Sequence, residues 1–391
     1  MPDTPPSRPP IGIAARLGWV SFFNDCSGEV LARVLPLFLT VGLGMSASFV
    51  GLVEGLAESA AIVLKGLSGW LSDRFSSRKG FVLGGYALSV LARACYLLTL
   101  SPLLLGCSRV LDRVGKGLRG APRDAMVADA AATGRSGRDF GITRFLDTLG
   151  AMAGLALVLA LGVGKGPINQ ALFRACAWIA LPLGLLALGL LAFWVPRIPR
   201  SVATTRRLAW QVPREVRGYL GIVFLFSLAN SSDAFLVLRA REAGFGVRET
   251  LGLFLVFNAL AAALAIPAGR LSDRFGRVRF LALGWAVYGV AYGIMGSTGT
   301  LAFALSLLGY GAFYGLTEGV EKALLTDLLQ PEHRGTGFGA FQSVQGVAAL
   351  LASPIMGLLI TLLGARRAFL ITGATALGSM VLLLIWAKQR R

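Results

Sequence analysis

Two short stretches of this sequence are near-copies of each other. The first copy reads Gly69-Trp70-Leu71-Ser72-Asp73-Arg74-Phe75-Ser76-Ser77-Arg78-Lys79. The second copy reads Gly269-Arg270-Leu271-Ser272-Asp273-Arg274-Phe275-Gly276-Arg277-Val278-Arg279. The core Leu-Ser-Asp-Arg-Phe returns after 200 residues. Each copy is basic and lies between two long apolar runs, which predicts a tight connection between two membrane helices.

The composition indicates a membrane protein. Of 391 residues, 55% are hydrophobic and only 15% are charged, whereas a soluble domain averages about 25% charged. A membrane-spanning helix needs roughly 20 apolar residues, so the chain can hold about a dozen. The net charge of +18 is explained by Lys and Arg in the loops on one side of the membrane. We therefore expect an all-α polytopic protein whose partner is a lipid bilayer and not a nucleic acid.

The apolar runs predict twelve spans in two sets of six. The first set lies at 14–40, 47–71, 80–100, 103–127, 140–163 and 171–195. The second set lies near 218–238, 248–271, 279–297, 301–328, 336–362 and 366–387. The expected organisation is a tail (1–13), an N-terminal six-helix bundle (14–195), an arginine-rich linker (196–217) and a C-terminal six-helix bundle (218–391). The tail and the linker are polar, so both are expected in the cytosol.

The distribution of Lys and Arg sets the expected orientation. If the two repeated loops face the cytosol, the basic linker and the basic C-terminal end lie on the same side. The connections at 41–46, 100–102 and 296–300 carry no Lys or Arg and face outward. Both termini are then cytoplasmic, which agrees with an even number of spans, and we expect a multi-pass protein of the bacterial inner membrane.

The pattern Gly-x-Leu-x-Asp-Arg-x-x-x-Arg-Lys resembles the loop signature of the major facilitator superfamily. The first copy matches it in full, and the second copy repeats its Gly-x-Leu-x-Asp-Arg part. The resemblance implies two six-helix bundles around a central cavity lined by the first, fourth, seventh and tenth spans, with the third, sixth, ninth and twelfth spans packed outside. It also implies that the loops control the switch between inward- and outward-open states. The residues expected to act in this gating are Gly69, Asp73, Arg74, Arg78, Gly269, Asp273 and Arg274.

The repeat extends beyond the loops. Asp129 matches Asp327 and Gly137 matches Gly335, each with an offset of 198 residues. The two halves of the chain are therefore expected to share one fold.

Charged residues inside the predicted spans are the candidate site. A charge near the bilayer centre costs about 2.5–3.5 kcal/mol on insertion scales, so such residues face the protein interior or water. The expected substrate and proton cavity contains Asp25, Glu29, Arg109, Asp112, Arg113, Lys116, Asp233 and Glu318. The alternative interpretation is that these charges only neutralise one another. The carboxylates of the first two spans, which include Glu54 and Glu58, are also candidates for proton coupling, and their alternative role is pairing with Arg33, Lys65 or the arginines of the fourth span.

The fourth span also has a distant resemblance to proton-coupled drug antiporters. In that motif an Arg, which would be Arg109, is followed by a Gln and then a Gly, where this chain has Asp112 and Arg113. The fifth span also lacks the Gly-Pro pair of those antiporters. These departures favour a polar substrate over an apolar drug.

We therefore predict a secondary active transporter of a small polar or charged solute, a proton-coupled monomer that works by alternating access. The alternatives are a multidrug or toxic-compound efflux antiporter and a sensor or assembly subunit with the same fold. An enzyme is not expected, because no nucleophile–base set and no nucleotide-binding loop is present. The single His333 and four cysteines without ligand spacing predict no metal and no cofactor. The identity of the solute, the direction of transport and the coupling ion stay open.

Overall fold

The structure is a computed structural model. It describes residues 12–75, 78–98, 100–132, 134–162, 169–197, 214–230, 236, 239–240, 242–245, 247–296 and 299–390. The predicted tail and most of the predicted linker lie outside these residues. The described part of the chain is helical, as the long apolar runs require in a membrane, where each backbone polar group must be satisfied within its own segment.

Twelve long α-helices are present in the described residues. The N-terminal bundle has α1 (Ile13–Leu37), α2 (Ala47–Arg74), α3 (Arg78–Leu98), α4 (Pro102–Ala130), α5 (Ser136–Ala160) and α6 (Gln170–Gly189). The C-terminal bundle has α7 (Arg214–Ala229), α9 (Val247–Phe275), α10 (Arg277–Met295), α11 (Thr300–Leu328), α12 (Arg334–Leu363) and α13 (Ala365–Lys388). Single π-helical turns η1 (Phe38–Gly42) and η2 (Leu190–Trp194) extend α1 and α6, and η3 (Pro331–His333) precedes α12. The twelve predicted spans therefore correspond to twelve helices.

Eight of the described helices are long and apolar enough to cross a membrane by composition alone, and they include α3, α5, α6 and α9–α13. The helices α1, α2 and α4 have similar lengths but carry more charge. The charge on α1, α2 and α4 indicates that these three helices line a polar interior.

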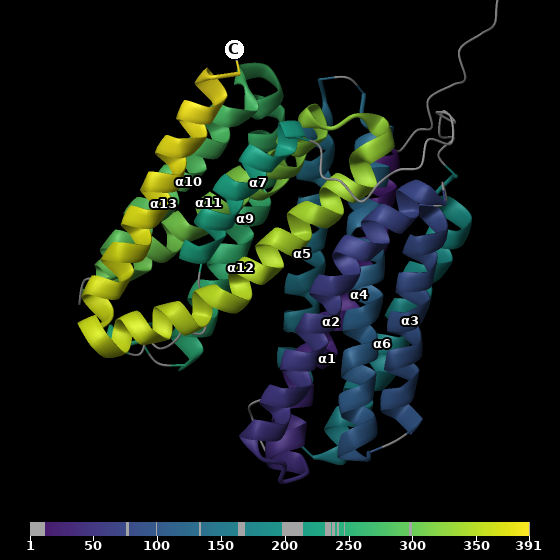
Figure 1. The fold of residues 1–391 in the computed structure, drawn as a ribbon. Coiled ribbons are helices and arrows are strands. Elements are labelled where there is room, and N and C mark those ends of the chain that lie inside the picture. Colours follow the sequence, from purple (N-terminus) through teal and green to yellow (C-terminus); the bar gives the residue numbers. More distant parts are fainter. Residues whose placement is uncertain are drawn as a thin grey trace, which may run out of the picture.

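The two bundles meet along two helix pairs. In the N-terminal bundle α1 packs on α5 and α4 packs on both α2 and α3, while in the C-terminal bundle α11 packs on α9 and α10. Between the bundles, α2 packs on α12 and α5 packs on α9. Figure 1 shows the bundles close together at the end that carries the C-terminus and apart at the other end. We call the first of these the motif end, because the repeated loops after α2 and α9 lie there.

The core of the C-terminal bundle is aromatic. The Phe226 and Trp285 rings stack at 4.2 Å between centroids, and Tyr288 and Tyr292 stack at 4.3 Å. Offset and edge-to-face ring contacts stabilise such a core by about 0.5–1.5 kcal/mol per pair beyond burial alone. Phe226 also contacts Phe313 of α11 at 5.5 Å between centroids, so the aromatic core gives α7, α10 and α11 a fixed mutual position, and α7 and α11 carry part of the cavity described next.

Candidate functional site

A cavity of about 650 Å³ lies between the two bundles. Seven of the eight cavity residues predicted from the sequence line it: Asp25, Glu29, Arg109, Asp112, Arg113, Lys116 and Glu318. The eighth, Asp233, lies outside the described residues. The cavity also receives side chains of α2, α5 and α12, so its wall is broader than the four spans expected from the family resemblance.

On the N-terminal wall, two arginines of α4 pair with two glutamates of α2. Arg109 binds Glu54 through two hydrogen bonds, Nε to Oε1 at 2.8 Å and Nη2 to Oε2 at 3.1 Å. One turn further, Arg113 lies 3.7 Å from Glu58. A bidentate pair is the strong form of the arginine–carboxylate interaction. In this structure Glu54 and Glu58 of α2 are therefore ion-paired with arginines of α4.

Side chains of the two bundles meet across the motif side of the cavity. Lys322 of α11 lies 3.0 Å from Asp124 of α4, and Gln342 of α12 donates to the same carboxylate at 2.7 Å. Arg144 of α5 lies 2.7 Å from Glu318 of α11. These contacts tie α4 and α5 to α11 and α12, so the predicted cavity residue Glu318 is held in a contact between the bundles.

Several cavity arginines were not selected from the sequence. Arg93 comes from α3, a span expected to pack outside, yet it is only 2% exposed and donates to the Asn24 side chain at 2.9 Å. Arg119 donates to Ser89 at 2.7 Å, and Arg123 pairs with Asp147 at 3.1 Å. Their signal was present, because each is a cation inside an apolar run.

Two carboxylates on the cavity wall accept hydrogen bonds from neutral donors. Glu321 of α11 is 6% exposed and accepts from Trp285 at 3.3 Å and from Gln345 at 3.2 Å. Asp25 of α1 accepts from the Asn24 amide at 3.1 Å. Within the described residues, neither carboxylate has a cation within 4.0 Å. Glu321 is a charge inside a predicted span, but it is not among the cavity residues expected from the sequence.

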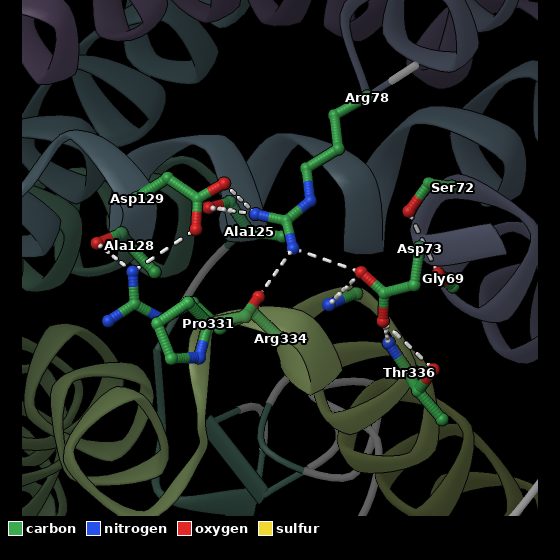
Figure 2. Close-up of polar contacts among 11 residues, drawn as sticks. Gly69, Ser72, Asp73, Arg78, Ala125, Ala128, Asp129, Pro331, Arg334 and Thr336 are labelled. Atoms are coloured by element: carbon green, nitrogen blue, oxygen red, sulfur yellow. Dashed lines mark hydrogen bonds and ion pairs between the residues drawn. The ribbon is translucent and has the colours of Figure 1, made fainter. Parts of the chain in front are cut away.

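At the motif end, Asp73 joins the end of α2 to the first turn of α12 (Figure 2). The carboxylate accepts from the backbone N–H groups of Gly335 at 3.1 Å and Thr336 at 2.6 Å, and from the Thr336 hydroxyl at 2.9 Å. A helix N-terminus carries free N–H groups and a partial positive charge, both of which favour a carboxylate. Asp73 is only 2% exposed, so this contact closes the two bundles against each other.

Arg78 and Asp129 continue this network. Arg78 binds Asp73 at 2.9 Å, the Pro331 carbonyl at 3.0 Å, and the carboxylate of Asp129 (Figure 2). Arg334 of α12 also reaches Asp129, at 3.1 Å. The network therefore contains charges from both bundles.

The second repeat forms the same arrangement between α9 and α5, also at the motif end. Asp273 of α9 accepts from the backbone N–H groups of Gly137 and Arg138, the start of α5, both at 2.9 Å. Arg277 pairs with Asp273 and lies 2.7 Å from Asp327. Arg277 thus holds the place of Arg78, one residue closer to its aspartate along the chain. An alignment of the two loops by Leu-Ser-Asp-Arg-Phe pairs Arg78 with Val278, so it does not reveal that Arg78 and Arg277 are equivalent.

The remaining predicted gating residues divide into two kinds. Gly69 and Gly269 lie at backbone contacts: a Cβ on Gly69 would stand 3.0 Å from the Gly335 carbonyl carbon, and one on Gly269 would stand 2.7 Å from the carbonyl carbon of Gly137. Arg74 and Arg274, by contrast, are exposed and lie over the rings of Trp70 and Phe275, at 5.4 Å and 5.3 Å.

A membrane protein of two similar helical bundles, with a polar cavity between them that is closed at one end, has the architecture of a solute carrier. The chain belongs to the Major Facilitator Superfamily, whose family model matches residues 17–259 and 219–391. It is a multi-pass membrane protein of this transporter family.

Known relatives agree with this assignment. An uncharacterized MFS-type transporter of Methanocaldococcus jannaschii is 37% identical over 358 residues, covering 88% of this chain and 87% of the relative. The human organic anion transporter MFSD10 has a similar fold, with a TM-score of 0.80, 18% identity, and coverage of 96% and 100% of the two chains. A bacterial homologue of the iron transporter ferroportin, solved in an outward-facing state, also gives a TM-score of 0.80, with 16% identity and coverage of 97% and 100%.

Proposed function

We propose that this protein is a secondary active transporter that moves a small polar or charged solute by alternating access. The observation that carries the proposal is the charged cavity between bundles that are joined at the motif end by Asp73 and Asp273. Both contacts have to open for the cavity to reach that side of the membrane, and they are equivalent in the two halves. Such a repeated contact suits a switch between two states.

Proton coupling is part of the proposal. A coupled carrier needs a carboxylate that binds and releases a proton during the cycle. An ion-paired carboxylate is a poor candidate, because its cation competes with the proton. We propose Glu321 and Asp25 for this role, because their donors in the described residues are neutral. Asp233, which was also a candidate from the sequence, lies outside the described residues.

The proposal includes a placement in the membrane. The basic loops at the motif end and the positive-inside rule support a cytosolic motif end, cytoplasmic termini and insertion in a bacterial inner membrane. The cavity would then face outward in this conformation. We propose a monomer, because one chain supplies both halves of the cavity.

Efflux of apolar drugs is the second function considered for this fold, and a sensor or assembly subunit is the third. The cavity wall argues against drug efflux, because seventeen Lys, Arg, Asp and Glu residues line it and an apolar solute cannot compensate their desolvation. The equivalent contacts of Asp73 and Asp273 argue against a sensor or assembly subunit, since a protein without a transport cycle has no need of a symmetric gate.

Counterflow in proteoliposomes tests the proposal. Vesicles are loaded with each of a panel of unlabelled solutes, including organic acids, sugars, amino acids and a lipophilic cationic dye, and uptake of the labelled compound is followed with and without a pH gradient. We expect at least one polar solute to exchange, with accumulation only under the gradient. Exchange of the dye alone would support drug efflux, and exchange of no solute would contradict a transport function.

A further inference from the structure

Two lysines of the N-terminal bundle are held close together on the cavity wall. Lys65 of α2 and Lys116 of α4 both line the cavity. Their helices touch backbone to backbone beside them, since a Cβ on Gly117 would lie 2.7 Å from the Ala61 carbonyl oxygen. The Ser68 hydroxyl also donates to the Gly117 carbonyl at 3.0 Å. This close approach is fixed by the absence of a side chain at Gly117.

Among the residues that the structure describes, neither ammonium group forms an ion pair with an acid. Within the described residues, no carboxylate oxygen lies within 4.0 Å of either Nζ, whereas Arg109, Arg123, Arg144 and Lys322 in the same cavity all have one. Arg113, one turn from Lys116 on α4, adds a third cation to this part of the wall.

The acids in electrostatic range of Lys65 and Lys116 do not form a close ion pair with either lysine. Those near Lys65 are Glu58 and Asp124, and each is shared with another cation: Glu58 lies 3.7 Å from Arg113, and Asp124 lies 3.0 Å from Lys322. Asp25 is the acid in range of Lys116. Two like charges so placed in a partly desolvated cavity repel each other, and a bound anion would remove that repulsion.

Besides Glu318, Glu321 and Lys322, the C-terminal wall of the same cavity offers neutral polar groups. It contains the amides of Asn230, Asn258 and Gln345 and the phenol ring of Tyr314. Amides and phenols donate to and accept from uncharged polar groups. The cavity therefore combines a cationic site at Lys65 and Lys116 with neutral donors and acceptors on the C-terminal wall, where Glu318 and Lys322 are already paired with Arg144 and Asp124.

We propose that Lys65 and Lys116 together bind a doubly charged anionic group of the transported solute, so that the substrate is a small organic dianion such as a dicarboxylate or a phosphate ester. Arg113 completes the cationic wall, and the neutral amides of the C-terminal wall receive the rest of the molecule. This inference rests on the proposed transport function, because it assigns the substrate class of the same cavity.

Thermal unfolding of the purified full-length protein tests this inference without a transport assay. The probes are succinate and inorganic phosphate, each compared with chloride at equal ionic strength, and choline serves as the cationic comparison. We expect both dianions, but not choline, to raise the Tm of the wild type. Lys65→Met and Lys116→Met each remove the repulsion, so each variant is expected to have a higher Tm than the wild type in chloride. The double variant is expected to lose the response to dianions.

Lys388→Met is the matched control, because Lys388 is exposed in the last turn of α13 and is not among the residues that line the cavity. It is expected to keep the full response. The inference is overturned if neither dianion stabilises the wild type, or if the double variant responds as strongly as the wild type. Binding that fails while counterflow of a neutral solute succeeds would overturn the dianion site alone. Binding without any transport would overturn the proposed function alone.

Discussion

Asp124 of α4 and Lys322 of α11 form an ion pair across the two bundles, with 3.0 Å between Oδ2 and Nζ. The two residues are 198 positions apart, the same offset that relates Asp129 to Asp327. Equivalent positions of the two halves thus carry opposite charges and touch each other. Two equivalent positions can meet only near the axis that relates the halves, so this pair lies at the centre of the interface.

We predict that Asp124 and Lys322 are energetically coupled. Asp124→Asn and Lys322→Met each leave a charge of the pair without its partner, and both are expected to destabilise the protein. Because they remove the same interaction, the double variant should be less destabilised than the sum, with a coupling energy of roughly 1–3 kcal/mol. Unfolding by a denaturing detergent measures the four proteins of the cycle. Additive effects would show that the pair contributes nothing.

We predict that Asp73→Asn and Asp273→Asn open the motif end. Each change removes the charge from hydrogen bonds to a helix N-terminus, and a hydrogen bond to a charged group contributes about 1.5–3 kcal/mol. A loss of about 2 kcal/mol corresponds to a shift of roughly 30-fold in the equilibrium between the two states. A cysteine in place of the cavity residue Ala151 should react faster with an impermeant maleimide added from the motif side.

Arg74→Gln is the control for this experiment, because Arg74 belongs to the same loop but is exposed and lies over the Trp70 ring. It should change the labelling rate much less than Asp73→Asn does. Equal effects of the two changes would mean that the charge of the loop, and not the contact with α12, sets the equilibrium.

We predict that Gly69→Ala weakens the closed motif end while Gly55→Ala on the same helix does not. The new Cβ at residue 69 would meet the backbone of Gly335 and Gly339, whereas at residue 55 it would meet no atom within 4 Å. Overpacking of this kind costs about 1–3 kcal/mol. The alanine at residue 55 should stabilise α2 slightly, because glycine is a poor helix former. The maleimide assay reports both variants, and a similar rate for the two would contradict the role of this contact.

We predict that Arg109 acts mainly through its pair with Glu54. Removing either partner leaves a poorly hydrated charge behind, which is strongly destabilising. Arg109→Gln and Glu54→Gln should therefore lower the Tm by similar amounts, and the double variant should be no worse than either. A loss of solute exchange in Arg109→Gln, with exchange retained in Glu54→Gln, would instead assign Arg109 to the solute.

The sequence was sufficient to predict the fold. Apolar runs of the right length gave the number and order of the helices, and α4 (Pro102–Ala130) differs from its predicted limits 103–127 by three residues at most. The prediction was less accurate at the seventh span, where α7 ends at Ala229 instead of continuing to 238. Hydropathy detects apolar content but not the backbone change that ends a helix inside an apolar run.

The sequence was less informative about the site. Charges inside apolar runs identified the cavity helices, but the partner of each charge depends on how the helices pack. Glu54 and Arg109 are 55 residues apart, and no local pattern joins them. Arg93 is not among the predicted cavity residues because its helix is expected to pack outside. A long arginine side chain can nevertheless extend from such a helix into the interior.

Distances between spin labels show whether the motif end opens as the opposite end closes, as alternating access requires. In a variant without the four native cysteines, one pair of labels at residues 75 and 275 reports the motif end, and a second pair at residues 159 and 301 reports the opposite end. We expect two populations. In one of them the motif-end distance is longer and the opposite distance is shorter than in the other, and the double variant Asp73→Asn, Asp273→Asn should contain more of this open-motif population. A single unchanged population in both proteins, or two distances that lengthen together, would contradict the account.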